Sequence, residues 1–541
     1  MQGFLMERNN KQNKPDRETT VFILFLAGMA AYYGWRMFAL TPWYDELYTY
    51  YYFISRGPVY AAIHWPLPNN HIGYSVLSAC LGIFGNAYIA LRGISYLCSL
   101  GSMILLYKIG RRCFTRGLAL IPVFLYTGMK LVNQFAVQGR GYALVSFCYL
   151  AAIYALLRIT AERKELFRDY VCFGMSLVLA LYAIPSSLYV VLPICLAGGL
   201  FLLASGGYRR LGRLILTALA GAVCTVGLYG VVWLAIGSNL LTKTEDSVYY
   251  GMGHGTIILH APFTALKTGI DYMLATPYIQ SVGSEGFFRK FINWLHSLLN
   301  EYYMGGAVPL AVLLVICAAG VLICIGKRIN NGSYRKTPAE VRGLYERFME
   351  IYLAVSLIGT ILMLVCLHSL PYYRVFSFAG ITVALAAAWL WQSAAKLFTS
   401  GRFGRYMPPL GSAAAGLLCI GMLLTPAYGA QYSDREAAIQ EAYAQIDLSQ
   451  VQKIAVTDCD QEYLLLFLYD IGEDRVTRNL TEAEAVLADK YLLTDCETDV
   501  IDWKGDDWKL YLTREEFAGA LTDSQMQAVY ENDRFILYQR K

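Results

Sequence analysis

The sequence TVFILFLAGMAAYYGWRMFAL occupies residues 20–40, and WYDELY follows it at 43–48. About 20 apolar residues in a helix cross the hydrocarbon core of a bilayer, so the first stretch has the length of a membrane span. The whole chain has 541 residues, of which 56% are hydrophobic, 14% aromatic and only 16% charged, too apolar a composition for a soluble protein of this length. The sequence therefore predicts an α-helical polytopic membrane protein.

Similar apolar runs recur along the chain. They lie at 88–107, 117–135, 141–157, 170–184, 187–205, 214–236, 306–326, 348–367, 373–393 and 407–427, and the run at 170–184 is the shortest. Short cytoplasmic loops hold an excess of Lys and Arg, and basic clusters occupy every second gap between these runs. We predict about 11 transmembrane helices in a domain spanning 20–427, with a cytoplasmic N-terminus at 1–19.

The C-terminal part differs in charge from the rest. Residues 1–427 carry 34 Lys and Arg against 16 Asp and Glu, whereas residues 428–541 carry 11 against 24. In this acidic tail, β-rich runs at 453–457 and 490–494 alternate with a helix-like stretch at 461–469. We predict a small extracytoplasmic α/β domain at 428–541 that binds or positions, and a disulfide between its Cys459 and Cys496 stays open.

Two long outer loops are expected, at 41–87 and 237–305. The first contains the apolar segment 72–84, which is too short to cross the membrane and is predicted to be an interfacial or re-entrant helix. The second contains His254, His260, His296 and Trp294 among several tyrosines. It either covers an acceptor site or forms an aromatic belt at the interface.

The adjacent carboxylates Asp45 and Glu46 are the first candidates for chemistry. Acidic side chains at a membrane surface are costly unless they have a function or a partner, although an acidic interfacial turn would give the same pattern. His71, at the start of segment 72–84, could orient a hydroxyl or contact a phosphate. The alternative is that this histidine simply precedes a helix.

Three arginines run against the expected charge distribution, because Arg92, Arg140 and Arg374 lie at outer ends of apolar spans. Each should therefore have an anionic partner. Guanidinium stays charged and binds phosphate oxygens bidentately, so a lipid phosphate fits. An ion pair with Asp45 or Glu46, or an ordinary headgroup contact, would also satisfy these charges.

Several motifs occur in the order typical of one enzyme family. After Asp45-Glu46 come Asn70-His71-Ile72-Gly73-Tyr74-Ser75-Val76-Leu77, then Phe84-Gly85 and Ala90-Leu91-Arg92-Gly93-Ile94-Ser95, then Gly139-Arg140-Gly141-Tyr142-Ala143-Leu144 and Tyr372-Tyr373-Arg374-Val375-Phe376. Together they resemble the GT-C superfamily glycosyltransferases of the branch that contains protein O-mannosyltransferases and lipid A aminoarabinose transferases (glycosyltransferase family 39). The chain departs from this pattern where a His-Pro-Pro-Leu motif is replaced by Asn70-His71-Ile72-Gly73.

The resemblance implies a polyprenyl-phosphate-sugar donor that enters from the bilayer and an acceptor hydroxyl on the outer face. Asp45 would be the catalytic base, and Glu46 would hold the acceptor or tune Asp45. Donor-phosphate ligands would be Arg140 and Arg374, supported by Arg92. The residues expected to position acceptor or donor are His71, Tyr48 and Tyr142.

Elementary chemistry agrees with these roles. A carboxylate near the anomeric carbon can take the hydroxyl proton and stabilise an oxocarbenium-like transition state, while arginines stabilise the phosphate leaving group. No metal or other cofactor is then required, although Asp45 and Glu46 could hold a divalent cation weakly. The expected partners are the polyprenyl-phosphate sugar, an acceptor glycan, lipid or protein, and the bilayer, with no nucleic acid.

Two other functions stay open at this point. A transporter or flippase of lipid-linked glycans would show charged or helix-breaking residues near span midpoints and often an internal repeat. An O-antigen-ligase-like enzyme would rely on Arg and His of outer loops. The early acidic pair favours the glycosyltransferase, which we place in a bacterial cytoplasmic (inner) membrane, with the sugar and acceptor unspecified.

Overall fold

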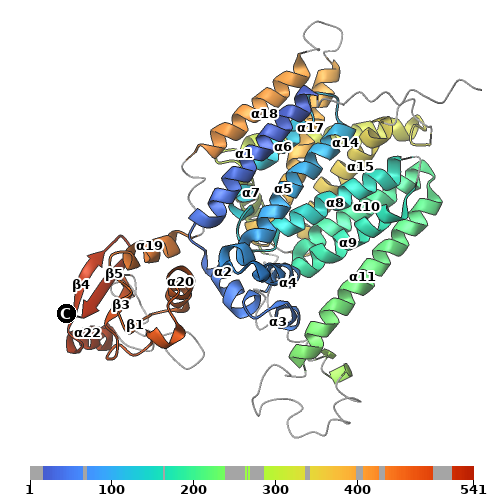
Figure 1. Ribbon diagram of the computed structural model, residues 1–541. Helices are drawn as coiled ribbons and strands as arrows, with labels where there is room; N and C mark the ends of the chain where they lie inside the picture. Colours follow the sequence, from blue (N-terminus) through green and yellow to red (C-terminus); the bar gives the residue numbers. More distant parts are fainter. Residues whose placement is uncertain are drawn as a thin grey trace, which may run out of the picture.

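The computed structural model describes residues 16–64, 70–162, 165–237, 262–264, 266–267, 285–335, 342–368, 370–397, 406–425, 433–490 and 514–540. Most of the helices form one bundle, and a smaller domain that contains a β-sheet lies beside one end of it (Figure 1). The predicted fold class, a polytopic helical membrane protein with a small C-terminal α/β domain, is thereby confirmed.

Seven helical segments in the described part of the chain are long and apolar enough to cross a membrane. They are α1 (Arg17–Ala39), α5 (Ala87–Cys113), α8 (Tyr142–Ala161), η3 with α10 (Pro185–Ser187 and Leu188–Ser205), α11 (Tyr208–Gly237), α14 (Ala307–Asn330), and the continuous run of α15 (Arg342–Ala354), η4 (Val355–Gly359) and α16 (Thr360–Cys366). Shorter helices of the bundle are α9 (Phe167–Ala183), α17 (Ala379–Leu397) and α18 (Met407–Leu423). The chain is a multi-pass membrane protein, and the number of 11 spans stays a prediction.

The run at 117–135 is broken into two helices, α6 (Leu120–Thr127) and α7 (Lys130–Phe135). Gly128 ends α6 where a side chain would meet the backbone of Cys419 at 3.1 Å. Carbonyls at a helix end need donors, and the Asn133 side-chain amide donates to the carbonyls of Thr127 and Met129. The break between α6 and α7 is therefore held by specific contacts.

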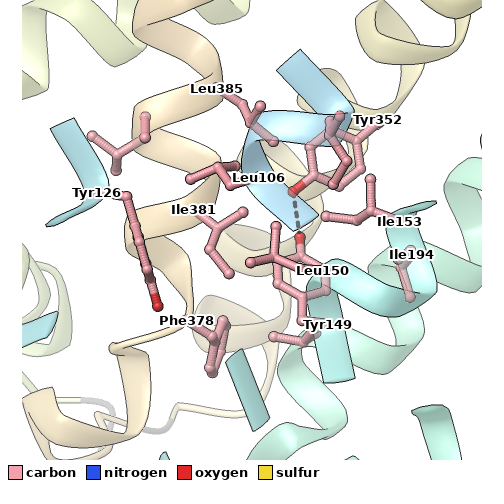
Figure 2. Packing of buried hydrophobic residues seen from close by; sticks show 14 of the residues in the cluster. Leu106, Tyr126, Tyr149, Leu150, Ile153, Ile194, Tyr352, Phe378, Ile381 and Leu385 are labelled. Atoms are coloured by element: carbon pink, nitrogen blue, oxygen red, sulfur yellow. Dashed lines mark hydrogen bonds between the residues drawn. The ribbon is translucent and has the colours of Figure 1, made fainter. Parts of the chain in front are cut away.

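The core of the bundle surrounds α8, and 78% of the apolar stretch of this helix is buried. Figure 2 shows this packing, with Leu150 and Ile153 of α8 among aliphatic and aromatic side chains of neighbouring helices. Polar contacts also lie inside it: the hydroxyls of Tyr149 and Tyr352 form a 2.7 Å hydrogen bond, and the Tyr352 hydroxyl lies 3.1 Å from the Thr382 hydroxyl. The buried hydroxyls satisfy each other, as buried polar groups must.

Short helices gather at one end of the bundle, which is the end that the sequence predicts to face outward. They are α2 (Tyr44–Thr49), η1 (Tyr50–Ile54), α3 (Pro58–Ile63), α4 (Ile72–Leu81) and η2 (Gly82–Phe84), and Figure 1 places α2, α3 and α4 there. The short helix expected over 72–84 is confirmed by α4 and η2. Pro68 and Asn69, just before it, lie outside the described residues.

The second predicted outer loop contains a helix that the sequence analysis did not anticipate, α13 (Phe287–Tyr302). Its Phe287, Phe291, Trp294 and Leu298 are buried, and the Trp294 indole donates to the Pro371 carbonyl at 2.7 Å. Trp294 is therefore part of the packed bundle and not of an aromatic belt. His254 and His260 of the same predicted loop lie outside the described residues.

The C-terminal domain contains a five-stranded sheet of order β2-β1-β3-β5-β4. The strands are β1 (Ile454–Ala455), β2 (Val476–Thr477), β3 (Ala485–Asp489), β4 (Met526–Glu531) and β5 (Phe535–Arg540), and the helices are α19 (Asp434–Tyr443), α20 (Cys459–Tyr469) and α22 (Arg514–Asp523). Strand β1 pairs in parallel with β2 and β3, whereas β5 is antiparallel to β3 and β4. The predicted strand 453–457 and helix 461–469 are confirmed; residues 491–494 and Cys496 lie outside the described part.

Candidate active site at the outer end of the helical bundle

The segment that carries the acidic pair forms α2, which begins after Trp43 in extended conformation. The Glu46 side chain reaches back and accepts a hydrogen bond from the Trp43 amide at 3.0 Å, satisfying one of the free N–H groups of the first turn. The helix continues as the π-helix η1, a geometry that is rare and frequent at functional sites. Asp45 and Glu46 thus lie in the first turn and point in different directions.

Glu46 is anchored to Arg92 in a buried bidentate ion pair. The Glu46 oxygens lie 2.8 Å from Arg92 Nε and 2.9 Å from Arg92 Nη2, and both side chains are 1% exposed. Glu46 also accepts from the Gly139 amide at 2.6 Å, while Arg92 Nη1 donates to the carbonyls of Met37 and Leu40. Neither side chain faces an open site, so this pair fixes α2 against α1 and α5, and the predicted phosphate-binding role of Arg92 finds no support in the geometry.

Asp45 faces two guanidinium groups instead. Its Oδ2 lies 3.7 Å from Arg140 Nη2 and 3.7 Å from Arg374 Nη1. Among the described residues no hydrogen bond to this oxygen is formed, and the Asp45 side chain keeps 15% of its surface exposed. The structure therefore brings together a carboxylate from the beginning of the chain and arginines from two distant segments.

Arg140 lies in the turn before α8 and is held by α2. Its Nη1 donates to the Thr49 hydroxyl at 2.8 Å and contacts the Asp45 carbonyl at 3.4 Å. The glycines on either side leave no room for a side chain, because a Cβ on Gly139 would lie 2.3 Å from the Leu91 side chain. This close packing places a charged residue at the end of a buried turn.

His71 lies beside Arg140, and its tautomer follows from its other neighbour. The Gly141 amide donates to His71 Nδ1 at 2.9 Å, so Nδ1 carries no proton and the neutral ring carries it on Nε2. That Nε2 is 3.3 Å from Arg140 Nη2. Two N–H donors face each other at this distance, an arrangement that calls for a shared acceptor such as an anionic oxygen.

The neutral state of His71 is enforced by its surroundings. Burial, together with the positive charges of Arg140 and Arg374, holds the pKa of His71 well below its usual value. Tyr142 packs its ring edge-to-face on the imidazole, with ring centroids 5.2 Å apart. Tyr142 thus supports His71, as a positioning role would require, although it is itself buried.

Arg374 completes the group from η5 (Tyr373–Phe376). Its guanidinium lies over the rings of Trp43 and Tyr372, with centroid distances of 5.3 and 4.8 Å. Arg374 is 26% exposed, against 3% for Arg140, so it is the more accessible of the two cations. Trp43, two residues before Asp45, is thus part of the site.

Tyr48, predicted to position a substrate, lies elsewhere. Its ring stacks on Tyr52 at 4.2 Å and belongs to the apolar cluster between α2, η1 and the C-terminal domain. Although residues 45 and 48 are three apart on a helix and therefore neighbours on its surface, Tyr48 is buried in that cluster. Its ring contacts those of Tyr44, Tyr52 and Phe53.

An apolar cavity of about 90 Å³ lies next to η5. Phe376, two residues after Arg374, lines it together with side chains of α10, α13, α16 and α17, including Tyr189, Trp294, Leu364 and Val383. Its walls are almost entirely hydrocarbon and aromatic. The cavity therefore offers an apolar compartment close to the cationic group.

Sequence reasoning missed Thr49, which binds Arg140, and the main-chain amides of Gly139 and Gly141 that bind Glu46 and His71. Only the unusual Gly-Arg-Gly sequence was available as a signal for the amides. Within the described ranges no three His, Cys, Asp or Glu side chains gather to hold a metal ion. Whether Asp45 and Glu46 bind a cation stays a prediction.

Comparison with known proteins supports the resemblance noted in the sequence. Residues 72–234 match the family model of dolichyl-phosphate-mannose-protein mannosyltransferases. The matched segment contains Arg92, Arg140 and Tyr142 but neither Asp45 nor Arg374. The chain thus resembles the GT-C branch of protein O-mannosyltransferases, as predicted; a search of the curated proteins finds no match.

Solved structures give weaker similarity. The archaeal oligosaccharyltransferase AglB from Archaeoglobus fulgidus, in complex with an inhibitory peptide and a dolichol-phosphate, has 13% identity and a TM-score of 0.43, over 88% of this chain and 70% of that one. ArnT from Cupriavidus metallidurans bound to undecaprenyl phosphate has 14% identity and a TM-score of 0.47, over 96% and 98%. Values this low establish neither shared activity nor shared site residues.

Proposed function

We propose that this chain is a membrane glycosyltransferase that transfers a sugar from a polyprenyl-phosphate-linked donor to an acceptor hydroxyl on the outer face of a bacterial cytoplasmic membrane. One observation carries the proposal: Asp45 Oδ2 lies 3.7 Å from Arg140 and from Arg374. A base and two phosphate-binding groups therefore surround one point. The match of residues 72–234 to a family of sugar transferases supports the reaction class.

The proposed reaction is a single displacement at the anomeric carbon. The acceptor hydroxyl gives its proton to Asp45 as its oxygen bonds to that carbon, and the bond from the carbon to the phosphate oxygen breaks. The departing phosphate gains one negative charge. Arg140 and Arg374 stabilise this charge as it develops, so that no acid has to protonate the leaving group.

His71 fits the same phosphate. Its Nε2–H and the Nη2 of Arg140 lie 3.3 Å apart and both donate, so one phosphate oxygen can accept from both. Because His71 is neutral, it contributes a directed hydrogen bond rather than a third full charge. Its role is to orient the donor, which agrees with the positioning role implied by the sequence.

The apolar cavity beside η5 suits the lipid part of the donor. Phe376 joins the cavity to the segment that carries Arg374, so a phosphate at Arg374 would place the first isoprene units near these walls. Burial of apolar surface stabilises binding by about 25 cal/mol per Å². A polyprenyl chain would therefore bind there without specific polar contacts.

Asp45→Asn tests the proposal, with membranes assayed for transfer of labelled sugar from a panel of polyprenyl-phosphate donors. Loss of a general base lowers rates by roughly 10²–10⁴-fold, and the isosteric change should leave membrane insertion normal. The control is Asp474→Asn, an exposed aspartate of the C-terminal domain. Transfer at the wild-type rate by Asp45→Asn would remove Asp45 as the base, and glycan transport without transfer would favour a transporter or flippase.

A further inference from the structure

The C-terminal domain contacts the segment that carries Asp45. The Glu436 carboxylate of α19 accepts a hydrogen bond from the Tyr44 amide at 2.8 Å, and the Thr41 hydroxyl donates to the Gln440 side chain at 2.5 Å. Tyr463 of α20 stacks on Tyr51, with ring centroids 5.2 Å apart. Figure 1 shows α19 and α20 on the side of this domain that faces α2.

Glu436 is unusual among these contacts because it is a buried acid, only 2% exposed. One oxygen serves the Tyr44 amide, but Oε2 accepts no hydrogen bond from the described N–H and O–H groups, and the same holds for Asp460 Oδ1 of α20. Asp460 is itself 4% exposed, and its charge acts on Glu436. Two neighbouring buried carboxylates repel each other, which favours a proton held between them.

The charges around this pair explain why the proton is retained. Four carboxyl groups meet two guanidinium groups: Glu436, Asp458, Asp460 and Asp489 surround Arg435, and Arg534 lies 3.5 Å from Asp489. Arg435 binds Asp458 and Asp460 directly and lies 3.9 Å from Asp489. The remaining neighbours, Tyr44 and Cys459, pair with each other through a 3.5 Å contact and add no positive charge. The cluster therefore has an excess of acid.

We propose that Glu436 is a positioning residue for the transfer reaction: by accepting the hydrogen bond from the Tyr44 amide, it holds the first turn of α2, and hence Asp45, against the C-terminal domain. This inference rests on the proposed function. Glu46 and Arg92 fix α2 from the side of the bundle, and Glu436 fixes it from the other side. Asp45 lies one residue from each anchor point, Tyr44 and Glu46.

The shared proton makes this anchor dependent on pH. Burial and the adjacent Asp460 raise the pKa of Glu436 to about 8, and burial followed by the charge of Asp458 raises the pKa of Asp460 to about 6. Because the pKa values of Glu436 and Asp460 are raised in the folded state, the stability that this anchor contributes is complete at low pH and is lost as the pH rises through those pKa values. At alkaline pH both buried carboxyl groups become anionic, and their mutual repulsion should weaken the packing of α19 against α20 and with it the anchor of α2.

The experiment compares four variants of the full-length protein in lipid nanodiscs. Glu436→Ala removes the acceptor of the Tyr44 amide. Glu436→Gln retains that acceptor and replaces the shared proton by a fixed N–H, and Asp460→Asn does the same from the other partner. Glu441→Ala is the matched control, because Glu441 lies on the same helix and its carboxylate accepts from the Tyr530 hydroxyl on the domain surface, away from α2.

The first readout is hydrogen exchange of the peptide that contains residues 44–49. Loss of one cap of this kind costs about 1 kcal/mol, so Glu436→Ala should exchange roughly fivefold faster in this peptide. Glu436→Gln and Glu441→Ala should match the wild type at neutral pH. Unchanged protection in a folded Glu436→Ala protein would overturn the proposal, whether or not a sugar donor has been found.

The second readout is transfer kinetics. Glu436→Ala should lower kcat roughly fivefold with the donor KM nearly unchanged, since the phosphate ligands are not touched. Glu436→Gln should restore kcat and abolish the decline of the wild-type rate at alkaline pH. If the rate of Glu436→Gln still declines at alkaline pH, the proposed role of Glu436 is wrong. If the wild type is inactive with every donor, the proposed function is wrong, and the hydrogen-exchange result alone then tests the role of Glu436.

Discussion

Removal of Arg92 separates a structural role from a phosphate-binding one. In Arg92→Met, Glu46 stays buried without its partner and loses two of its four hydrogen bonds, and the carbonyls of Met37 and Leu40 lose their donor. Breaking a buried ion pair from one side costs about 3–5 kcal/mol. We therefore expect a large fall in the free energy of unfolding before any question of activity arises.

The double variant Arg92→Met with Glu46→Met sharpens this expectation. Additive losses would reach about 6–10 kcal/mol, but the double variant buries no unpaired charge, and its cost is set by the backbone groups left without partners, about 1 kcal/mol each. The main ones are the amides of Trp43 and Gly139 and the carbonyls of Met37 and Leu40. The free energy of unfolding of the double variant should therefore be at least about 2 kcal/mol higher than the value expected if the two single losses simply added.

The assay is unfolding of the purified protein in detergent, with the single variants, the double variant and Arg374→Met compared. Arg374 is 26% exposed, so its replacement should change stability by less than about 1 kcal/mol while transfer falls. If Arg92→Met melts like the wild type and only raises the donor KM, Arg92 contacts the phosphate and the structural interpretation is wrong.

Two further predictions concern the neighbours of Arg140. In His71→Asn the Asn oxygen can replace Nδ1 as acceptor for the Gly141 amide, but the Nε2–H donor is lost. We expect a folded protein with roughly tenfold weaker binding of the sugar donor, measured as KM. Because the pKa of His71 is held well below its usual value, the pH profile of the wild-type rate should show no step near the ordinary histidine pKa. In Gly139→Ala the new Cβ would lie 2.3 Å from the Leu91 side chain and 3.0 Å from its carbonyl; we expect a loss of about 1–3 kcal/mol in unfolding free energy, and wild-type stability would show that this turn can move.

The membrane architecture could be predicted because a helix that crosses the bilayer needs a long apolar run, and such runs are visible in the sequence. The amphipathic α13 was missed for the complementary reason: its apolar residues are spaced along one face and never form a continuous run. The break between α6 and α7 was missed because it depends on Asn133, whose amide reaches carbonyls that precede it in the chain. Such a contact is visible only when the backbone positions are known.

For the site, residue type predicted that each arginine needs an anion but not which one. Arg140 and Arg374 converge on Asp45, whereas Arg92 is paired with Glu46. An ion pair with an acidic side chain was an open alternative for all three arginines, and their charge alone does not decide which of them forms one. Depth does not separate them either, since Arg140 is 3% exposed and Arg92 is 1% exposed; the distinction arises from which of the two acidic side chains α2 turns towards each arginine.

Helical geometry explains why two adjacent carboxylates have different roles. Successive residues of a helix point about 100° apart, so Asp45 and Glu46 cannot both face Arg140 and Arg374. Glu46 points into the bundle, where a carboxylate is tolerated only because Arg92 and two main-chain amides satisfy it. The same anchor fixes the rotation of α2, and that rotation is what directs Asp45 towards the arginines. The acidic pair therefore works as one unit, in which the buried member determines where the reactive member points.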